Sequence, residues 1–277
     1  MFQNLFKIIN AILYTIRPSA TVGACLLVLA AFDPAKEELM QLAFLMLATF
    51  LGSSYCFLVN DIYDREKDLL NNKPRPIATG ILPVKVALGM AISCGILFSI
   101  STWFLGIVPF ALSFVFLLFA SIYSLVNLRT GFPANALVAF IVSGTQWGVW
   151  LIKPDDYLWS SSLFLFLFTI PREMLLDWLD VSGDKKIGKT SLPIQLTHKQ
   201  VKWLIVLFLF LATGSLMHSI LKMNSSYFMT ACNVLTVLSG WVAFLPFLLR
   251  ADHKTALLSV RASHFTFAFL ILALLSR

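Results

Sequence analysis

Charged residues are scarce in this sequence. Asp, Glu, Lys and Arg together make up 13% of it, whereas about 25% is usual for a soluble domain. Histidine and cysteine are also rare, with four of each, and none of them has the spacing of a zinc site or a redox pair. The cysteines lie singly within apolar segments, where they are expected to pack as small hydrophobic residues. These shortages argue against a soluble globular protein and against a zinc or redox site.

Apolar residues are abundant in this sequence. They make up 58% of the 277 residues, and the mean hydropathy is +0.83. Because a membrane helix needs about 20 mostly apolar residues, the sequence predicts an all-α integral membrane bundle of about nine transmembrane helices. They form a single domain over residues 1–277. The predicted spans are 10–32, 38–60, 84–104, 106–126, 133–152, 158–180, 200–221, 227–249 and 260–276.

The positive charges fall mainly on one side of the predicted bundle. All but four of the 21 Lys and Arg residues lie in the N-terminus, in the loops after even-numbered spans, or at the adjoining helix ends. By the positive-inside rule, the N-terminus and those loops are cytoplasmic, and the C-terminus lies outside a cell membrane that the chain crosses many times. The same asymmetry explains the net charge of +7, so no nucleic-acid partner is expected.

Two acidic motifs share one spacing. Asp61, Asp64 and Asp68 follow the second span at offsets 0, 3 and 7, and the residues that end the sixth span repeat these offsets with Asp177, Asp180 and Asp184. On a helix, these offsets place three carboxylates on one face. A lysine follows the last Asp by five residues in both motifs. A single motif of this kind is often only solvated charge at a helix end, but the repetition favours a site.

Clustered carboxylates near hydrocarbon repel one another unless a cation lies between them. Two such faces, opposed across a bundle, could hold Mg²⁺, which takes a few carboxylates and completes its octahedron with phosphate oxygens and water. Nearby Lys and Arg would bind the remaining phosphate oxygens. The expected ligand is therefore a diphosphate with a lipid tail, and magnesium would stabilise diphosphate as a leaving group.

The motifs resemble those of the UbiA superfamily of intramembrane prenyltransferases. The stretch NDIYDREKD (60–68) is similar to the family's NDxxDxxxD motif, and DWLDVSGD (177–184) is similar to its second motif. The segments IRPSA, YSLVNLR, NKPRPIATG and GKTSLPI also resemble family segments. The second motif is most similar to the branch that includes digeranylgeranylglyceryl phosphate synthases and chlorophyll synthases.

The resemblance implies an isoprenyl diphosphate donor, a lipid-soluble or aromatic acceptor, and Mg²⁺. The implied metal ligands are Asn60, Asp64, Asp68, Asp180 and Asp184. Asp61 and Asp177 would complete or orient the metal shells, and Asp64, Asp180, Asp61 and Asp177 form the implied catalytic set. One of these aspartates would take the proton of the acceptor.

The implied diphosphate contacts are Lys73, Arg75, Arg129, Arg172, Lys185, Arg17 and Tyr123. Two departures from the family pattern remove a phosphate or acceptor contact. Leu176 stands where many members carry a lysine, and Asn127 and Leu128 replace another lysine near Tyr123.

The predicted function is Mg²⁺-dependent transfer of an isoprenyl group to an acceptor within the membrane. A terpene cyclase that uses the same metal site is an alternative. A secondary transporter is a weaker one, because a transporter would carry its ionisable residues at mid-membrane on broken helices. In this sequence, every ionisable motif residue except Arg17 lies near the end of a span.

Overall fold

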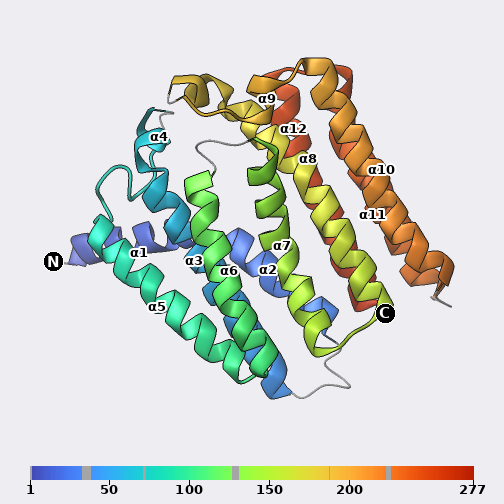
Figure 1. Cartoon of the computed structure of the whole chain (residues 1–277), viewed down its shortest axis with the longest axis horizontal. Coiled ribbons are helices and arrows are strands. Elements are labelled where there is room, and N and C mark those ends of the chain that lie inside the picture. Colours follow the sequence, from blue (N-terminus) through green and yellow to red (C-terminus); the bar gives the residue numbers. More distant parts are fainter. Residues whose placement is uncertain (1, 33–38, 71–72, 127–130, 187, 223–225) are drawn as a thin grey trace. The chain divides into compact units, whose positions relative to one another are not determined.

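The computed structural model describes residues 2–32, 39–70, 73–126, 131–186, 188–222 and 226–277 (Figure 1). These residues form twelve helices and no strand, so the all-α prediction is confirmed. The chain folds into two compact units. Unit 1 comprises residues 1–29 and 34–128, and unit 2 comprises residues 30–33 and 129–277. The single-domain assignment stays a prediction.

Unit 1 is built around one long helix. Helix α3 packs against α1, α5 and α6. Small side chains allow the close approach of α5, because a Cβ added at Gly95 would lie 3.4 Å from the ring of Tyr55 on α3. The helices of unit 1 are α1 (Phe2–Ile16), α2 (Pro18–Ala31), α3 (Leu39–Tyr63), α4 (Arg65–Leu70), α5 (Val84–Trp103) and α6 (Ile107–Val126).

The first predicted span, residues 10–32, is not one straight helix. Helices α1 and α2 meet at Arg17 with a bend of 49°. Pro18 lacks the N–H that would continue the helix, and a proline disfavours the α conformation in the residue before it. Arg17 accordingly has a φ of 48°, in the left-handed region. The first predicted span therefore consists of two helices that are joined at this residue.

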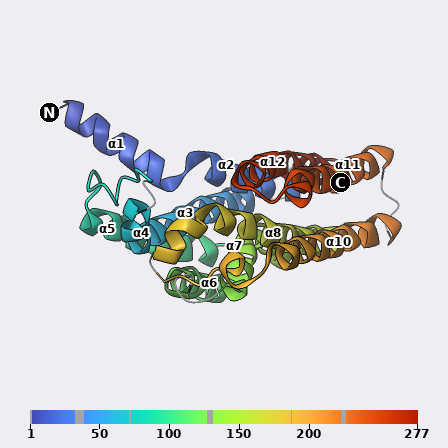
Figure 2. The same ribbon diagram turned by 90° about the horizontal axis from the view of Figure 1, so that it is seen from above.

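Unit 2 is arranged around α8, which contacts α7, α10 and α12. Figure 2 shows α11 and α12 as one layer lying over α8 and α10. Gly240 on α11 permits tight packing, since a Cβ there would lie 3.1 Å from the ring of Phe168 on α8. The helices of unit 2 are α7 (Phe132–Ile152), α8 (Asp156–Lys186), α9 (Leu192–Gln195), α10 (His198–Lys222), α11 (Tyr227–Leu249) and α12 (His253–Leu275).

The helices carry many large apolar side chains on their outer surfaces, including Phe210, Val242 and Leu249. Surfaces of this kind are unfavourable in water and suit a bilayer. By length and composition, six of the described helices can cross a membrane, or seven if the bent pair α1–α2 is one span.

The predicted number of nine spans is therefore not confirmed, although each predicted segment is helical. Helix α6 counts only as a shorter apolar helix over residues 107–123. Helix α8 contains three consecutive serines and an Arg–Glu pair, which lower its apolar content. The protein is a multi-pass membrane protein.

Candidate active site

The first acidic motif keeps a helical register through the end of α3. The N–H of Asp64 donates to the Asn60 carbonyl at 2.8 Å, and the N–H of Asp68 donates to the Asp64 carbonyl at 2.8 Å. These i to i−4 bonds carry the register across the junction with α4. Asp61, Asp64 and Asp68 are all buried. The predicted common face of three carboxylates is therefore present.

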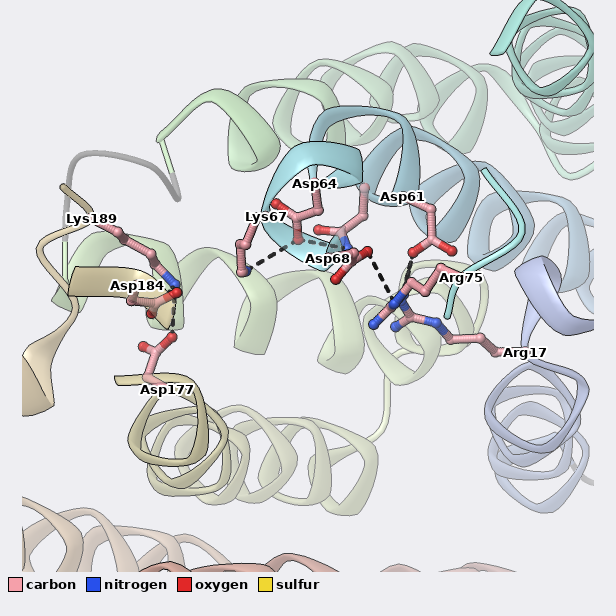
Figure 3. Close-up of polar contacts among 10 residues, drawn as sticks. Arg17, Asp61, Asp64, Lys67, Asp68, Arg75, Asp177, Asp184 and Lys189 are labelled. Atoms are coloured by element: carbon pink, nitrogen blue, oxygen red, sulfur yellow. Dashed lines mark hydrogen bonds and ion pairs between the residues drawn. The ribbon is translucent and has the colours of Figure 1, made fainter. Parts of the chain in front are cut away.

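Cations from three parts of unit 1 neutralise this face (Figure 3). Arg17 Nη2 lies 2.8 Å from Asp61 Oδ1, and Arg75 Nη1 contacts the same oxygen. Arg75 Nε lies 3.1 Å from Asp68 Oδ2. Asp64 Oδ2 receives Lys67 Nζ at 3.3 Å. Arg75 thus bridges the first and third carboxylates, and Asp64 lies outside that bridge.

Two features show that the charged carboxylates of this face are not fully compensated by the nearby cations. Burial, followed by repulsion from Asp64, raises the pKa of Asp68 to about 6, while Lys67, Lys73 and Arg17 lower it in turn. Asp61 is 1% exposed, and its Oδ2 has no hydrogen-bond partner among the residues that the structure describes. A buried carboxylate oxygen in this state fits a bound cation.

A hydrophobic cluster fixes the loop that supplies Arg75. Ile77 and Leu82 from this loop pack with Leu58 and Val59 of α3. The loop is closed by a hydrogen bond from the N–H of Leu82 to the Pro76 carbonyl at 3.0 Å. The apolar side chains next to the motif therefore hold the backbone from which Arg75 reaches back to the carboxylates.

The second motif lies entirely within α8. One buried lysine connects its first and third carboxylates, because Lys189 Nζ lies 3.0 Å from Asp177 Oδ1 and 3.1 Å from Asp184 Oδ2 (Figure 3). Lys189 is 4% exposed and Asp184 is fully buried. The other oxygen of Asp177 accepts a hydrogen bond from Asn135 Nδ2 of α7 at 3.0 Å.

Close packing against α7 fixes the loop that carries Lys189. A Cβ added at Gly131, just before α7, would lie 3.1 Å from the backbone nitrogen of Leu192. Gly188 has a φ of +71°, which glycine adopts at little cost. The turn after α8 can therefore reverse sharply and return Lys189 to the carboxylates.

The same backbone hydrogen bond follows both motifs. The N–H of Lys73 donates to the Asp68 carbonyl at 2.8 Å, and the N–H of Lys189 donates to the Asp184 carbonyl at 2.9 Å. The lysines found at equal spacing in the sequence thus make equivalent backbone bonds. In each motif, a cation from the loop beyond the helix bridges the carboxylates at offsets 0 and 7.

The remaining predicted contacts have varied surroundings. Arg172 Nη1 pairs with Glu173 at 3.0 Å, and Lys185 is exposed at the end of α8. Asp180 and Tyr123 are half-buried on α8 and α6. Arg129 lies outside the described residues. The predicted role of Asp180 as a metal ligand stays a prediction, and so do the predicted contacts of the other side chains with diphosphate.

Three polar residues at the motifs were not identified as site residues from the sequence. The sequence signal for Lys189 was its spacing, because it follows the last aspartate of its motif by five residues, as Lys73 does. Lys67 lies within the first motif, directly before Asp68, and its spacing matches nothing in the second motif. Asn135 lies more than forty residues before Asp177 in the sequence, and no local pattern distinguishes it. Only the packing of α7 against α8 reveals it.

The oxygen ligands of the two motifs fit a hard divalent cation whose coordination shell is completed by other ligands. Each motif offers carboxylate oxygens, and Asn60 adds a carboxamide whose Nδ2 donates to Asp64 Oδ2 at 3.3 Å. Within the described part of the chain, no three His, Cys, Asp or Glu side chains gather closely enough to enclose a metal. Magnesium suits such a partial site, because it usually keeps water and phosphate oxygens in its shell.

The sequence is similar to those of known proteins. Residues 18–272 match the UbiA prenyltransferase family. A digeranylgeranylglyceryl phosphate synthase of Thermococcus kodakarensis is 28% identical over 172 residues, which are 62% of each chain. The synthase of Sulfolobus acidocaldarius is 26% identical over 212 residues, or 71% of this chain and 73% of that one. The match to the first relative thus spans less than two thirds of its length.

Solved structures share the fold. A UbiA homologue from Aeropyrum pernix superposes with a TM-score of 0.74 at 17% identity, covering 95% of this chain and 98% of that one. A homologue from Archaeoglobus fulgidus, bound to GPP and Mg²⁺, gives a TM-score of 0.68 at 17% identity over 96% and 100% of the two chains. None of these relatives supports the cyclase alternative. With the family matching residues 18–272, nearly the whole of its length, the chain belongs to the UbiA prenyltransferase family.

Proposed function

We propose that this protein transfers an isoprenyl group from a prenyl diphosphate to a lipid-soluble or aromatic acceptor, with magnesium as cofactor. The observation that carries the proposal is the presence of two acidic motifs of equal spacing, each with a cation bridging its outer carboxylates. Relatives named as prenyl-lipid synthases and a homologue that binds GPP and Mg²⁺ support the donor and the metal.

Each motif would hold magnesium with its own residues. Asn60, Asp64 and Asp68 would bind magnesium at the first motif, and Asp180 and Asp184 would bind it at the second. When bound, magnesium offsets the negative charge of the diphosphate leaving group. Asp61 and Asp177 would orient the neighbouring ligands and would be available to accept the proton of the acceptor.

Cationic side chains would hold the phosphate oxygens that magnesium does not reach. Arg17 and Arg75 are suited to this role, because a guanidinium can bind a phosphate and a carboxylate at the same time through different N–H groups. Arg17 also lies 4.6 Å from the centre of the Phe57 ring, which restricts where its guanidinium can move. Lys73, Arg129, Arg172, Lys185 and Tyr123 are further candidates.

The acceptor would be a membrane lipid rather than a water-soluble molecule. The names of the relatives favour a prenylated glycerol phosphate, and an aromatic acceptor is the second choice. The distribution of Lys and Arg supports an orientation in which the N-terminus and both motifs face the cytoplasm and the C-terminus lies outside.

Product analysis tests the reaction. The purified protein is incubated with Mg²⁺, prenyl diphosphates of different lengths and either a glycerol phosphate lipid or an aromatic acceptor, and the products are identified by mass spectrometry. We expect a prenylated acceptor and released diphosphate, and no product when EDTA removes the metal. Full turnover in EDTA would contradict the magnesium mechanism. A cyclised hydrocarbon as the only product would contradict transfer.

Accessibility labelling tests the orientation. Single cysteines at Lys186 and at Asp156, both exposed positions, are introduced into a chain lacking its four native cysteines. A membrane-impermeant reagent added outside intact cells should label only the second. Labelling of both from one side would contradict the proposed orientation.

A further inference from the structure

The side chain of Asn135 is a buried carboxamide, and only one of its two polar atoms has a hydrogen-bond partner among the described residues. It lies in the first turn of α7 and is 3% exposed. Its Nδ2 donates to Asp177 Oδ2 at 3.0 Å. Its Oδ1 is buried and has no hydrogen-bond partner among the residues the structure describes. Because a buried carbonyl oxygen without a donor is unfavourable, this oxygen calls for a bound cation or a bound water.

Asp177 is held by donors from two different segments. Lys189 Nζ takes Oδ1 at 3.0 Å, and Asn135 Nδ2 takes Oδ2 at 3.0 Å. Two donors on opposite oxygens fix the rotation of the carboxylate. Groups that orient ligands in this way commonly determine how well a site binds its metal.

The first motif contains a similar carboxamide within its own sequence. Asn60 donates its Nδ2 to Asp64 Oδ2 at 3.3 Å. In the second motif, the residue that precedes the first aspartate is Leu176, which cannot donate. A carboxamide from another helix, Asn135, contacts this motif instead.

We propose that Asn135 is a positioning residue of the second motif, with its N–H fixing Asp177 and its oxygen serving the magnesium shell. This inference rests on the proposed function, since it assumes that magnesium diphosphate binds at the motif. An amide oxygen is a suitable partner for Mg²⁺ or for a water bound to it.

The test is a magnesium titration that requires no turnover. The melting temperature of the full chain in detergent is measured against Mg²⁺ concentration with inorganic diphosphate present. For Asn135→Ala, we expect the half-saturating Mg²⁺ concentration to rise about 10-fold. The matched control is Asn233→Ala, which removes a fully buried carboxamide of the same unit. The Asn233 side chain accepts a hydrogen bond from the Tyr157 hydroxyl and donates one to the Met229 carbonyl. The control should lower the melting temperature and leave the half-saturating Mg²⁺ concentration unchanged.

A second variant keeps the size of the side chain. Asn135→Asp replaces the donor with a second anion beside Asp177, so we expect a lower melting temperature without Mg²⁺ and a larger rise on its addition than in the wild type. If both variants respond to Mg²⁺ as the wild type does, Asn135 only fills space and the inference is wrong.

A third variant separates this inference from the proposed function. Asp184→Asn removes a proposed metal ligand of the second motif and should weaken the melting response to magnesium diphosphate more than Asn135→Ala does. If the wild type itself shows no such response and no prenyl transfer, both the function and the role of Asn135 are refuted. If Asp184→Asn weakens the response while the Asn135 variants keep that of the wild type, only the role of Asn135 is refuted.

Discussion

The two acidic motifs have the same spacing but different counter-charges. In the first motif, Arg17, Arg75 and Lys67 contact the carboxylates, and the Arg75 side chain is 21% exposed. In the second, Lys189 connects the outer carboxylates and is almost completely buried, with Asn135 as a neutral donor. The first face is therefore contacted by two partly solvated arginines and a buried lysine, whereas one almost fully buried lysine bridges the outer carboxylates of the second.

The shared feature is the cation that bridges offsets 0 and 7. Those positions are two turns apart, about 10 Å along the helix, so only a long side chain returning from the following loop can reach both. Asp64 and Asp180, at offset 3, lie outside the bridge. We therefore expect the middle aspartate to matter most for chemistry and the bridging cation to matter most for stability.

The largest effect should come from Asp64→Asn and Asp180→Asn. Each keeps the shape of the side chain and removes the charge that holds magnesium, so we expect kcat to fall by about 100-fold or more. Prenyl transfer is measured at saturating Mg²⁺, with the melting temperature checked in parallel. Asp156→Asn, an exposed change at the start of α8, is the matched control and should keep full activity. Near-normal turnover in both motif variants, if they are folded, would mean that the acidic faces are not catalytic.

Removing the bridging cation should lower the free energy of unfolding more in the second motif than in the first. Lys189→Met breaks the ion pair with the fully buried Asp184, and breaking a buried pair costs about 3–5 kcal/mol. Arg75→Met should cost less, about 1.5–3 kcal/mol, because Arg17 still contacts Asp61. The free energy of unfolding is measured in detergent without Mg²⁺.

A double variant provides the control for this comparison. Lys189→Met combined with Asp184→Asn should recover much of the loss, since the buried carboxylate charge that Lys189 offsets is then removed as well. Equal losses for Lys189→Met and Arg75→Met would show that burial of the bridge does not distinguish the motifs.

The smallest effects concern one left-handed residue in each unit. Gly188→Ala should lower stability by roughly 1–2 kcal/mol, because its φ is +71° while a Cβ there would meet no atom within 4 Å. In unit 1, Arg17→Gly should be more stable than Arg17→Ala by a similar amount, since both lose the ion pair but only glycine suits a φ of 48°.

Gly214→Ala is the control for the backbone effect. Gly214 lies inside α10, and a Cβ there also meets nothing within 4 Å. Alanine should stabilise this helical position by about 0.5–1 kcal/mol. The same sign of change at Gly188 and Gly214, measured by thermal melting, would contradict the role assigned to the left-handed turn.

Sequence reasoning worked where the signal was local. Apolar segments predicted helices because a backbone in hydrocarbon must satisfy its own hydrogen bonds, and each predicted segment is helical. The number of spans is harder to predict. The serines of α8 lower the hydropathy of one span, and the break at Arg17 divides another into two shorter helices. Pro18 is a local signal for that break, because a proline disfavours the α conformation in the residue before it.

The sequence by itself determined that three carboxylates would share a face at two helix ends, because helical period follows directly from residue spacing. It also determined membership of the family through those motifs. Only the tertiary structure decided which side chains neutralise them. Arg17, Asn135 and Lys189 reach the carboxylates through a helix break, a neighbouring helix and a reversed loop. The contacts of Arg17 and Asn135 join residues distant in the chain, so they depend on packing that no local pattern encodes. The lysine at position 189 is visible in the sequence, but only the folded loop brings its side chain to both carboxylates.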